Sequence, residues 1–179
     1  LWSPSVEAVP EPCELAIIAV PASQVSQVLR ALGRNGTRIA VVISAGLNNE
    51  NGLRQQMLEA ARESDIRIIG PNCLGALVPR AGLNASFATS DALPGKLAFL
   101  SQSGALATAI LDWAQARGIG FSAVLSVGDM ADAGLDELVA LFADDRETSA
   151  ILIYLEGLTD GQSFLKAVRA VRARKPIIV

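Results

Sequence analysis

The stretch LAIIAVPASQVSQVLRALGRNGTRIAVVISAG, residues 15–46, contains two short apolar runs separated by a segment with helical periodicity. The apolar runs, at residues 15–20 and 38–43, are rich in Ile and Val, and each ends in a loop of small residues. Residues 23–34 between them have the apolar spacing of a helix that is covered on one face. Short apolar runs that alternate with helical segments are typical of βαβ units and parallel sheets. The stretch therefore predicts an α/β fold.

The same alternation continues along the rest of the chain. The remaining elements are expected as helix 50–64, strand 66–69, strand 96–100, helix 103–117, strand 121–126, helix 135–143, strand 149–154, helix 161–174 and strand 176–179. Residues 70–95 have no helical period and contain several Gly and Pro residues, so we expect a crossover between two units there. The predicted fold is α/β with parallel sheets and helices on both faces, divided near residue 93 into domains at residues 1–92 and 93–179.

Both ends of this pattern are incomplete. The first set has three strands and lacks the Gly-rich first turn with which a nucleotide-binding domain usually begins. The run PIIV at residues 176–179 is an apolar strand without the loop and covering helix that a parallel strand needs. We therefore expect the protein to extend beyond both ends of the chain.

Composition excludes several classes of function. With 51% hydrophobic residues the chain has ample material for buried cores, but no apolar run approaches the roughly 20 residues of a membrane span. The start LWSPSVEAVPEP is not a secretory signal, so a cytoplasmic protein is expected. A net charge of −3 without a basic stripe argues against nucleic acid. The chain has no His, and Cys13 and Cys73 have no CxxC spacing, so no metal site is predicted.

In open parallel sheets, ligands bind at the carboxyl ends of the strands. The loop SQSG, residues 101–104, joins a predicted strand to a predicted helix that starts near Ser103. Unpaired N–H groups of Gly104, Ala105 and Leu106, the helix dipole, and the hydroxyls of Ser101 and Ser103 would form an anion cradle. The alternative is that Ser103 is only a helix N-cap and Gly104 a tight-turn residue.

Other polar residues follow predicted strands. Asn72 in GPNCLG would hold a substrate carbonyl or carboxylate, whereas Cys73, without a His partner, is interpreted as a small buried hydrophobe more readily than as a nucleophile. The Glu156 carboxylate should emerge at a strand end, as a positioned acid or as a helix-capping group. Asp129 and Asp132 in VGDMADAG are expected in a solvated loop.

The helix predicted at residues 103–117 has a candidate core face. Leu106, Ala109, Ile110 and Trp113 fall together on one side of a helical projection. Trp113 is therefore predicted to pack in the core and not to contact a ligand.

Five consecutive blocks, GPNCLG, GKLAFLSQSGAL, GFSAVLSVGDMAD, LFADDRETSAILIYLEG and KPIIV, resemble one family in order and spacing. This is the nucleoside-diphosphate-forming acyl-CoA synthetase family, which includes the α-type region of succinyl-CoA synthetase and the ADP-forming acetyl-CoA synthetases. The resemblance implies part of a Rossmann-like CoA-binding domain, followed by a flavodoxin-like succinyl-CoA synthetase domain. It also implies an ATP-grasp domain on the same or another chain, and an oligomer.

The resemblance further implies a reaction. In the family, an acyl-CoA and phosphate give an acyl phosphate, which phosphorylates a histidine, and the phosphoryl group then passes to a nucleoside diphosphate. Coenzyme A is the implied cofactor, and ADP or ATP with Mg would bind only through the ATP-grasp domain. The absent histidine is expected to lie downstream, beyond KPIIV.

The family's sites carry over to this sequence residue by residue. Ser101, Ser103, Gly104 and Ala105 match the phosphate-binding helix start, and Asn72 and Cys73 match the neighbourhood of the acyl thioester. The loops that line CoA correspond to Val20, Pro21, Ser44, Ala45 and Gly46. Glu156 lies near the carboxylate that holds the family's histidine and is the predicted catalytic residue.

Two alternatives remain at the level of sequence. Blocks such as GLNASFA and AILDWA also resemble the CoA-sensing region of bacterial protein lysine acetyltransferases with synthetase-like domains. A non-catalytic CoA-binding module is the other alternative. Residues beyond Val179 would discriminate the first of these from a synthetase.

Overall fold

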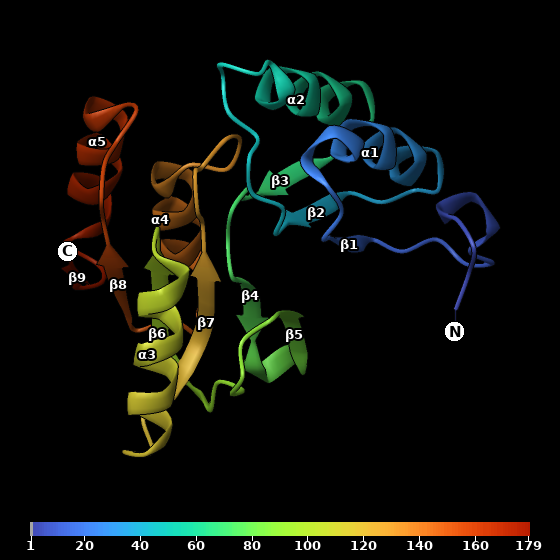
Figure 1. The fold of residues 1–179 in the computed structure, drawn as a ribbon. Helices are drawn as coiled ribbons and strands as arrows, with labels where there is room; N and C mark the ends of the chain where they lie inside the picture. The colour runs from blue at the N-terminus through green and yellow to red at the C-terminus, as the bar shows by residue number, and fades with distance from the viewer. Residues whose placement is uncertain (1) are drawn as a thin grey trace.

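The computed structural model describes residues 2–179, which form two sheets with flanking helices (Figure 1). The first sheet has the order β1-β2-β3 and the second the order β5-β4-β7-β6-β8-β9. The elements are β1 Leu15–Ile18, α1 Val25–Arg34, β2 Ile39–Val42, α2 Leu53–Glu63, β3 Arg67–Ile69, β4 Gly75–Val78, β5 Leu83–Ser86, β6 Pro94–Ser101, α3 Gly104–Gln115, β7 Phe121–Ser126, α4 Leu135–Asp144, β8 Ala150–Tyr154, α5 Gly161–Val171 and β9 Ile177–Ile178, with short 3-10 helices at Val6–Ala8, Ala22–Gln24 and Pro79–Ala81. The α/β prediction is confirmed.

The first sheet is parallel, and α1 and α2 lie together on one of its faces (Figure 1). Leu29 of α1 and Met57 of α2 are fully buried against Ile68 of β3. The two helices can approach closely because α1 carries Gly33, where an added Cβ would lie 2.4 Å from the Cβ of Ser64. Within the described residues, helices on both faces are found only in the second sheet.

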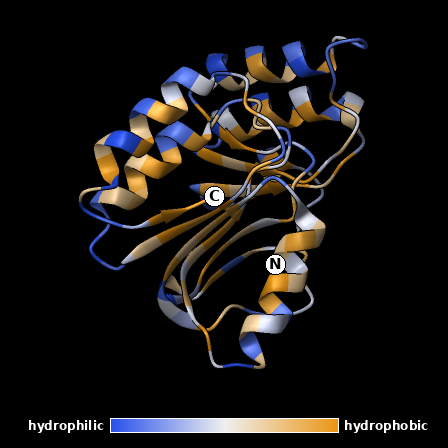
Figure 2. Cartoon of the chain, turned by 90° about the vertical axis from the view of Figure 1, so that its left-hand side faces the viewer, coloured by the Kyte–Doolittle hydropathy of each residue, from blue (hydrophilic) through white to orange (hydrophobic). Residues whose placement is uncertain are grey.

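The second sheet is covered on both faces because successive apolar side chains along its strands point to opposite faces. Leu100 of β6 packs in one cluster with α4 and α5, while its neighbour Phe99 packs with Leu111 of α3 in another cluster. Figure 2 shows hydrophobic residues along the strands and hydrophobic and hydrophilic residues alternating along the helices. No helix within residues 2–179 is both long and apolar enough to span a membrane.

The segment at residues 70–95, expected to be a crossover, contains two strands of the second sheet. β4 pairs antiparallel with both β5 and β7, so this sheet is mixed and not purely parallel. The strands were not foreseen because GALV and LNAS are short and lack a long apolar run. The division into domains at residues 92 and 93 remains a prediction.

The VGDMAD loop, at residues 127–132, joins the two sheets. Asp129 is exposed, as expected for a solvated loop, but Asp132 is half-buried and the loop also has a connecting role that was not expected. The Asp129 N–H donates to Pro71 O at 3.0 Å, and the Ala131 N–H donates to Gly70 O at 2.9 Å. The loop comes this close because Gly128 has φ +51°, and an added Cβ there would lie 2.2 Å from Pro71 O. The loop after β3 is thereby fixed against the loop after β7.

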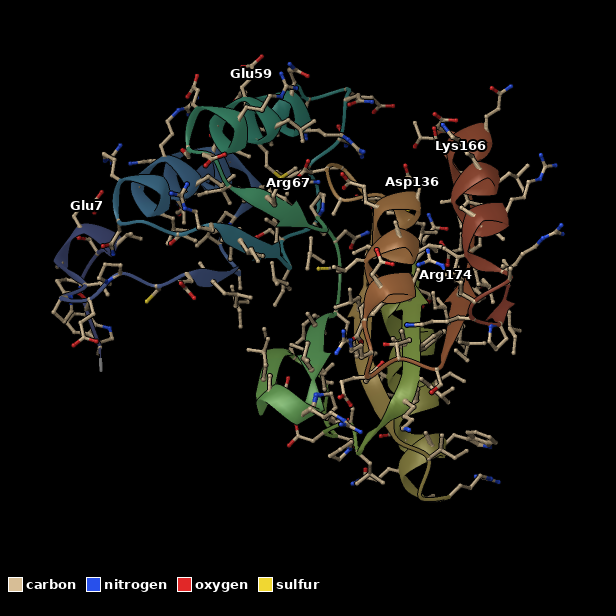
Figure 3. All side chains as sticks on the ribbon, turned by 180° about the vertical axis from the view of Figure 1, so that it is seen from behind. Glu7, Glu59, Arg67, Asp136, Lys166 and Arg174 are labelled. Atoms are coloured by element: carbon tan, nitrogen blue, oxygen red, sulfur yellow. The ribbon has the colours of Figure 1, made fainter. Side chains whose placement is uncertain are left out.

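The Asp132 carboxylate makes a second connection between the sheets. It accepts hydrogen bonds from the Ile68 N–H at 2.7 Å and from Arg67 Nε at 3.0 Å. Arg67, labelled on β3 in Figure 3, also donates to Glu137 of α4 at 2.6 Å. Hydrogen bonds to these two carboxylates raise the pKa of Arg67, so it is charged at every accessible pH. The contact between the sheets is therefore both hydrogen-bonded and ionic.

The predicted core face of α3 is wrong. The buried residues of the helix are Ala107, Leu111 and Ala114, whereas Trp113 is 49% exposed with the Arg117 guanidinium 4.5 Å from its ring centroid. Ala107, Leu111 and Ala114 form the face that packs on the sheet, and Trp113 lies on another side of the helix. Trp113 is a surface residue.

Candidate functional site

The loops after β1, β2 and β3 meet at the carboxyl edge of the first sheet. The Ser44 hydroxyl donates to Val20 O at 2.5 Å, and the Asn72 N–H donates to Ser44 O at 3.1 Å. These hydrogen bonds hold the loops predicted to line CoA next to the predicted acyl site. Pro21, Ala45 and Gly46 of the loops are exposed, so their backbone is accessible to a ligand.

An open cleft of about 510 Å³ lies where the two sheets meet. Six of the residues predicted from the sequence line it together: Asn72, Cys73, Ser103, Gly104, Ala105 and Glu156. They come from the loop after β3, the start of α3 and the loop after β8. Ser101 and the five CoA-loop residues do not line this cleft.

The start of α3 has a serine cap and, among the described residues, two N–H groups that remain without a partner. The Ser103 hydroxyl accepts from the Leu106 N–H at 3.3 Å, so one of the three N–H groups expected in the cradle is used by the cap. Within residues 2–179, the N–H groups of Gly104 and Ala105 have no hydrogen-bond partner. Two free donors therefore remain at the positive end of the helix dipole, which stabilises a nearby anion by typically 0.3–1 kcal/mol.

Ser101 has a different position from the one predicted for a phosphate ligand. It is fully buried, and its hydroxyl donates to Ser103 O at 2.8 Å and accepts from the Ser103 N–H at 3.2 Å. The hydroxyl is thus used within its own loop. The geometry favours a role for Ser101 in shaping the turn that presents Gly104 and Ala105.

Gln102 is a site residue that the sequence reasoning missed. Its Oε1 accepts from the N–H groups of Glu156 at 2.5 Å and Gly157 at 2.9 Å, and its Nε2 donates to Gly157 O at 2.9 Å. One amide side chain thus holds the loop that carries Glu156 against the loop that starts α3. The available signal was a long polar side chain between the two serines of SQSG.

Asn72 and Cys73 occupy opposite environments in the same loop. Asn72 is exposed, has φ +56°, and donates from Nδ2 to Asp129 Oδ1 at 3.2 Å. Cys73 is only 3% exposed, and its thiol donates to Val42 O at 3.4 Å. Burial raises the pKa of the Cys73 thiol to about 11, so it is protonated at neutral pH and is a poor nucleophile.

The electrostatics of the cleft depend on backbone groups. Among the described residues that line it, Glu156 alone carries a charge. An anion in the cleft would therefore be held by N–H donors and the helix dipole instead of by Lys or Arg. Within residues 2–179, no three His, Cys, Asp or Glu side chains gather as a metal site requires.

The apolar part of the cleft was also missed. Ile43, Leu74, Phe87 and the side chain of Thr108 line it beside the polar residues. Phe87 is 61% exposed although it is aromatic. No pattern in the sequence assigns these four residues to one site, because they come from four separate segments of the chain.

Comparison with known proteins identifies the class of protein. Residues 3–79 match the family described as the CoA binding domain, and residues 94–179 match the succinyl-CoA ligase like flavodoxin domain. With these two domains in this order, the chain belongs to the nucleoside-diphosphate-forming acetyl-CoA synthetase family.

Individual relatives make the likeness more specific. The chain is 45% identical over 179 residues to the α subunit of acetate–CoA ligase [ADP-forming] I of Pyrococcus furiosus, covering 98% of this chain and 39% of that protein. It is 35% identical to 4-hydroxybutyrate–CoA ligase [ADP-forming] of Nitrosopumilus maritimus, covering 98% of this chain and 26% of the relative.

A solved structure has the same arrangement of elements. It is the dinucleotide forming acetyl-coenzyme A synthetase 1 of Ca. Korarchaeum cryptofilum in complex with phosphate and ADP, which matches with a TM-score of 0.90 and 38% identity. The match covers 97% of this chain and 38% of that one. The chain thus spans about two fifths or less of these three relatives.

Proposed function

We propose that the chain forms the acyl-CoA and phosphate site of an ADP-forming acyl-CoA synthetase. One observation carries the proposal: the cleft brings the predicted acyl site at Asn72 together with the free N–H groups of Gly104 and Ala105. A thioester carbonyl and a phosphate ion can thereby lie side by side, as their reaction requires. The likeness to acetate–CoA ligases supports the same assignment.

In the proposed reaction, CoA lies along the loops of Val20, Pro21, Ser44, Ala45 and Gly46, with its thioester beside Asn72 and Cys73. A phosphate oxygen attacks the thioester carbonyl, a C–O bond forms, the C–S bond breaks, and CoA leaves as the thiol after taking up a proton. The N–H groups of Gly104 and Ala105 hold the phosphate oxygens in place. The product is an acyl phosphate.

The second half of the proposed reaction needs groups from outside these residues. The chain contains no His, so the histidine that takes the phosphoryl group is supplied from elsewhere in the whole protein. Glu156, at the edge of the cleft, would receive that imidazole and hold it by a hydrogen bond. An ATP-grasp domain or subunit, which would bind ADP and Mg, is the proposed partner in an oligomer, and the α-subunit name of the Pyrococcus furiosus relative supports it.

The proposal is tested by incubating the full-length protein with acetyl-CoA and labelled phosphate, with and without ADP. We expect labelled protein that ADP discharges to ATP. Protein that binds acetyl-CoA but never takes up label would refute the synthetase function and favour the acetyltransferase-associated or non-catalytic alternatives. The relatives reported above are all CoA ligases or synthetases, which favours the first outcome.

A variant at the start of α3 tests whether the phosphate binds in the cleft. Ala105→Pro removes one of the two free N–H groups, and proline is tolerated in the first turn of a helix. A hydrogen bond to a charged group contributes about 1.5–3 kcal/mol, so the KM for phosphate should rise about 10- to 100-fold. Ala105→Ser keeps the N–H and is the matched control.

A further inference from the structure

Phe87 presents an aromatic ring to the cleft without a packing role that explains it. The residue directly follows β5, its side chain is 61% exposed, and it lines the same cavity as Asn72 and Gly104. Among the described residues, its ring stacks on no other aromatic ring. Aromatic and apolar side chains that line a cleft usually contact the apolar part of a bound ligand, while the polar groups fix its orientation.

Hydrogen bonds fix where Phe87 lies along the cleft. On one side, the Asn72 N–H donates to Ser44 O, which places Asn72 next to the predicted CoA loops. On the other side, the Phe87 N–H donates to Leu74 O at 3.2 Å. From the CoA loops, the order is therefore Asn72 and Cys73, then Leu74, then Phe87.

The start of α3 lies beside Leu74, the middle residue of this series. A Cβ added at Gly104 would be 3.4 Å from the Cβ of Leu74, so the free N–H groups are next to Leu74. A phosphate on those groups and a thioester at Asn72 occupy the polar part of the cleft. The remaining wall is apolar and consists of Ile43, Leu74 and Phe87, with Thr108 beside them.

We propose that Phe87 determines acyl-chain size, by closing the end of the cleft that receives the acyl group and so favouring short acyl chains. The inference rests on the proposed function, because it takes the thioester to lie at Asn72. The acyl group extends away from the CoA loops, and the Phe87 ring is the apolar surface it meets. Truncating the ring lengthens the space available to the chain.

The test compares acetyl-CoA with butyryl-CoA in the full-length protein, using phosphate- and ADP-dependent formation of ATP. Phe87→Ala should raise the ratio of kcat/KM for butyryl-CoA to that for acetyl-CoA by at least about 10-fold, the usual effect of one or two methylene groups in an apolar pocket. Phe87→Leu should give a smaller rise in the same direction. Because the ring is largely exposed, neither change removes a core contact.

The control is Trp113→Ala, which removes another exposed aromatic ring, from the last turn of α3 and away from the cleft. Its substrate ratio should equal that of the wild type. An unchanged ratio in both Phe87 variants, or an equal shift in Trp113→Ala, would overturn the inference. If the wild-type protein makes no ATP from any acyl-CoA, phosphate and ADP, the proposed function itself fails, and the two failures are thus distinguished.

Discussion

Replacing Gln102 with Ala removes the three hydrogen bonds between the loop that starts α3 and the loop after β8. Two are accepted from the N–H groups of Glu156 and Gly157, at 2.5 and 2.9 Å, and one is donated to Gly157 O at 2.9 Å. A hydrogen bond contributes about 1 kcal/mol net, and water can replace the lost partners because both residues are exposed. We expect the free energy of unfolding to fall by about 1 kcal/mol, well below the ~3 kcal/mol of three bonds lost without replacement.

The local effect of Gln102→Ala should be larger than the global one. Amides at residues 155–158 should exchange with solvent faster in hydrogen-exchange mass spectrometry of the full-length protein, because opening this loop no longer breaks the bonds to Gln102. Gln115→Ala is the matched control, since Gln115 is exposed near the end of α3 and has no side-chain hydrogen bond within residues 2–179. Equal exchange at residues 155–158 in both variants would refute the view that Gln102 positions the Glu156 loop.

Three further changes test the fold around the cleft. Gly128 has φ +51°, and an added Cβ would lie 2.2 Å from a carbonyl oxygen, so Gly128→Ala should lower the free energy of unfolding in urea by about 2–4 kcal/mol. The control Gly52→Ala, whose Cβ meets open space, should cost about 1 kcal/mol. Equal losses would contradict the close approach of the two loops. Asp132→Ala should cost about 1–3 kcal/mol in the same assay, because the Ile68 N–H of β3 loses its partner. A loss below about 0.5 kcal/mol is the ordinary effect of a surface change and would show that the carboxylate is not needed there. Burial raises the pKa of the Cys73 thiol from 9.0 to about 11, so the thiol ionises first in the unfolded state and stability should fall as pH rises from about 9 to 11. Cys73→Ala should lack that fall. At pH 8, iodoacetamide should label the exposed Cys13 well before Cys73.

The sequence was a good guide to the elements and to the loops that follow the strands. The alternation of apolar runs and helical segments gave the α/β fold, and the loops after β3, β6 and β8 do line one cleft. The prediction succeeded because periodicity is local, and because the carboxyl ends of the parallel neighbours β6 and β8 share one edge of the second sheet. For the same reason, Ser103, Gly104 and Glu156 could be expected close together without any knowledge of distances, and they do line the same cleft. The loop after β3 reaches the cleft from the other sheet.

Two of the errors concern packing between segments far apart in the chain. Trp113 has the spacing of a core residue but is exposed, because the face of Ala107, Leu111 and Ala114 packs against the sheet instead. The loop of Asp129 and Asp132 is polar enough to be solvated, yet its backbone and the Asp132 carboxylate connect the two sheets. In each case the local pattern was compatible with two outcomes, and long-range contacts selected one.

The sequence by itself determined the order of strands and helices, the small-residue loops at the strand ends and the helix start that offers N–H groups to an anion. Only the tertiary structure decided that Gln102 holds the Glu156 loop, that Ser101 is used within its own turn, and that Phe87 lines the cleft. Helical and strand periodicities act over a few residues, so they can be read along the chain. The cleft depends on the contact between the two sheets and on the strand order β5-β4-β7-β6-β8-β9 of the second. These bring together residues tens of positions apart and have no signature in any single segment.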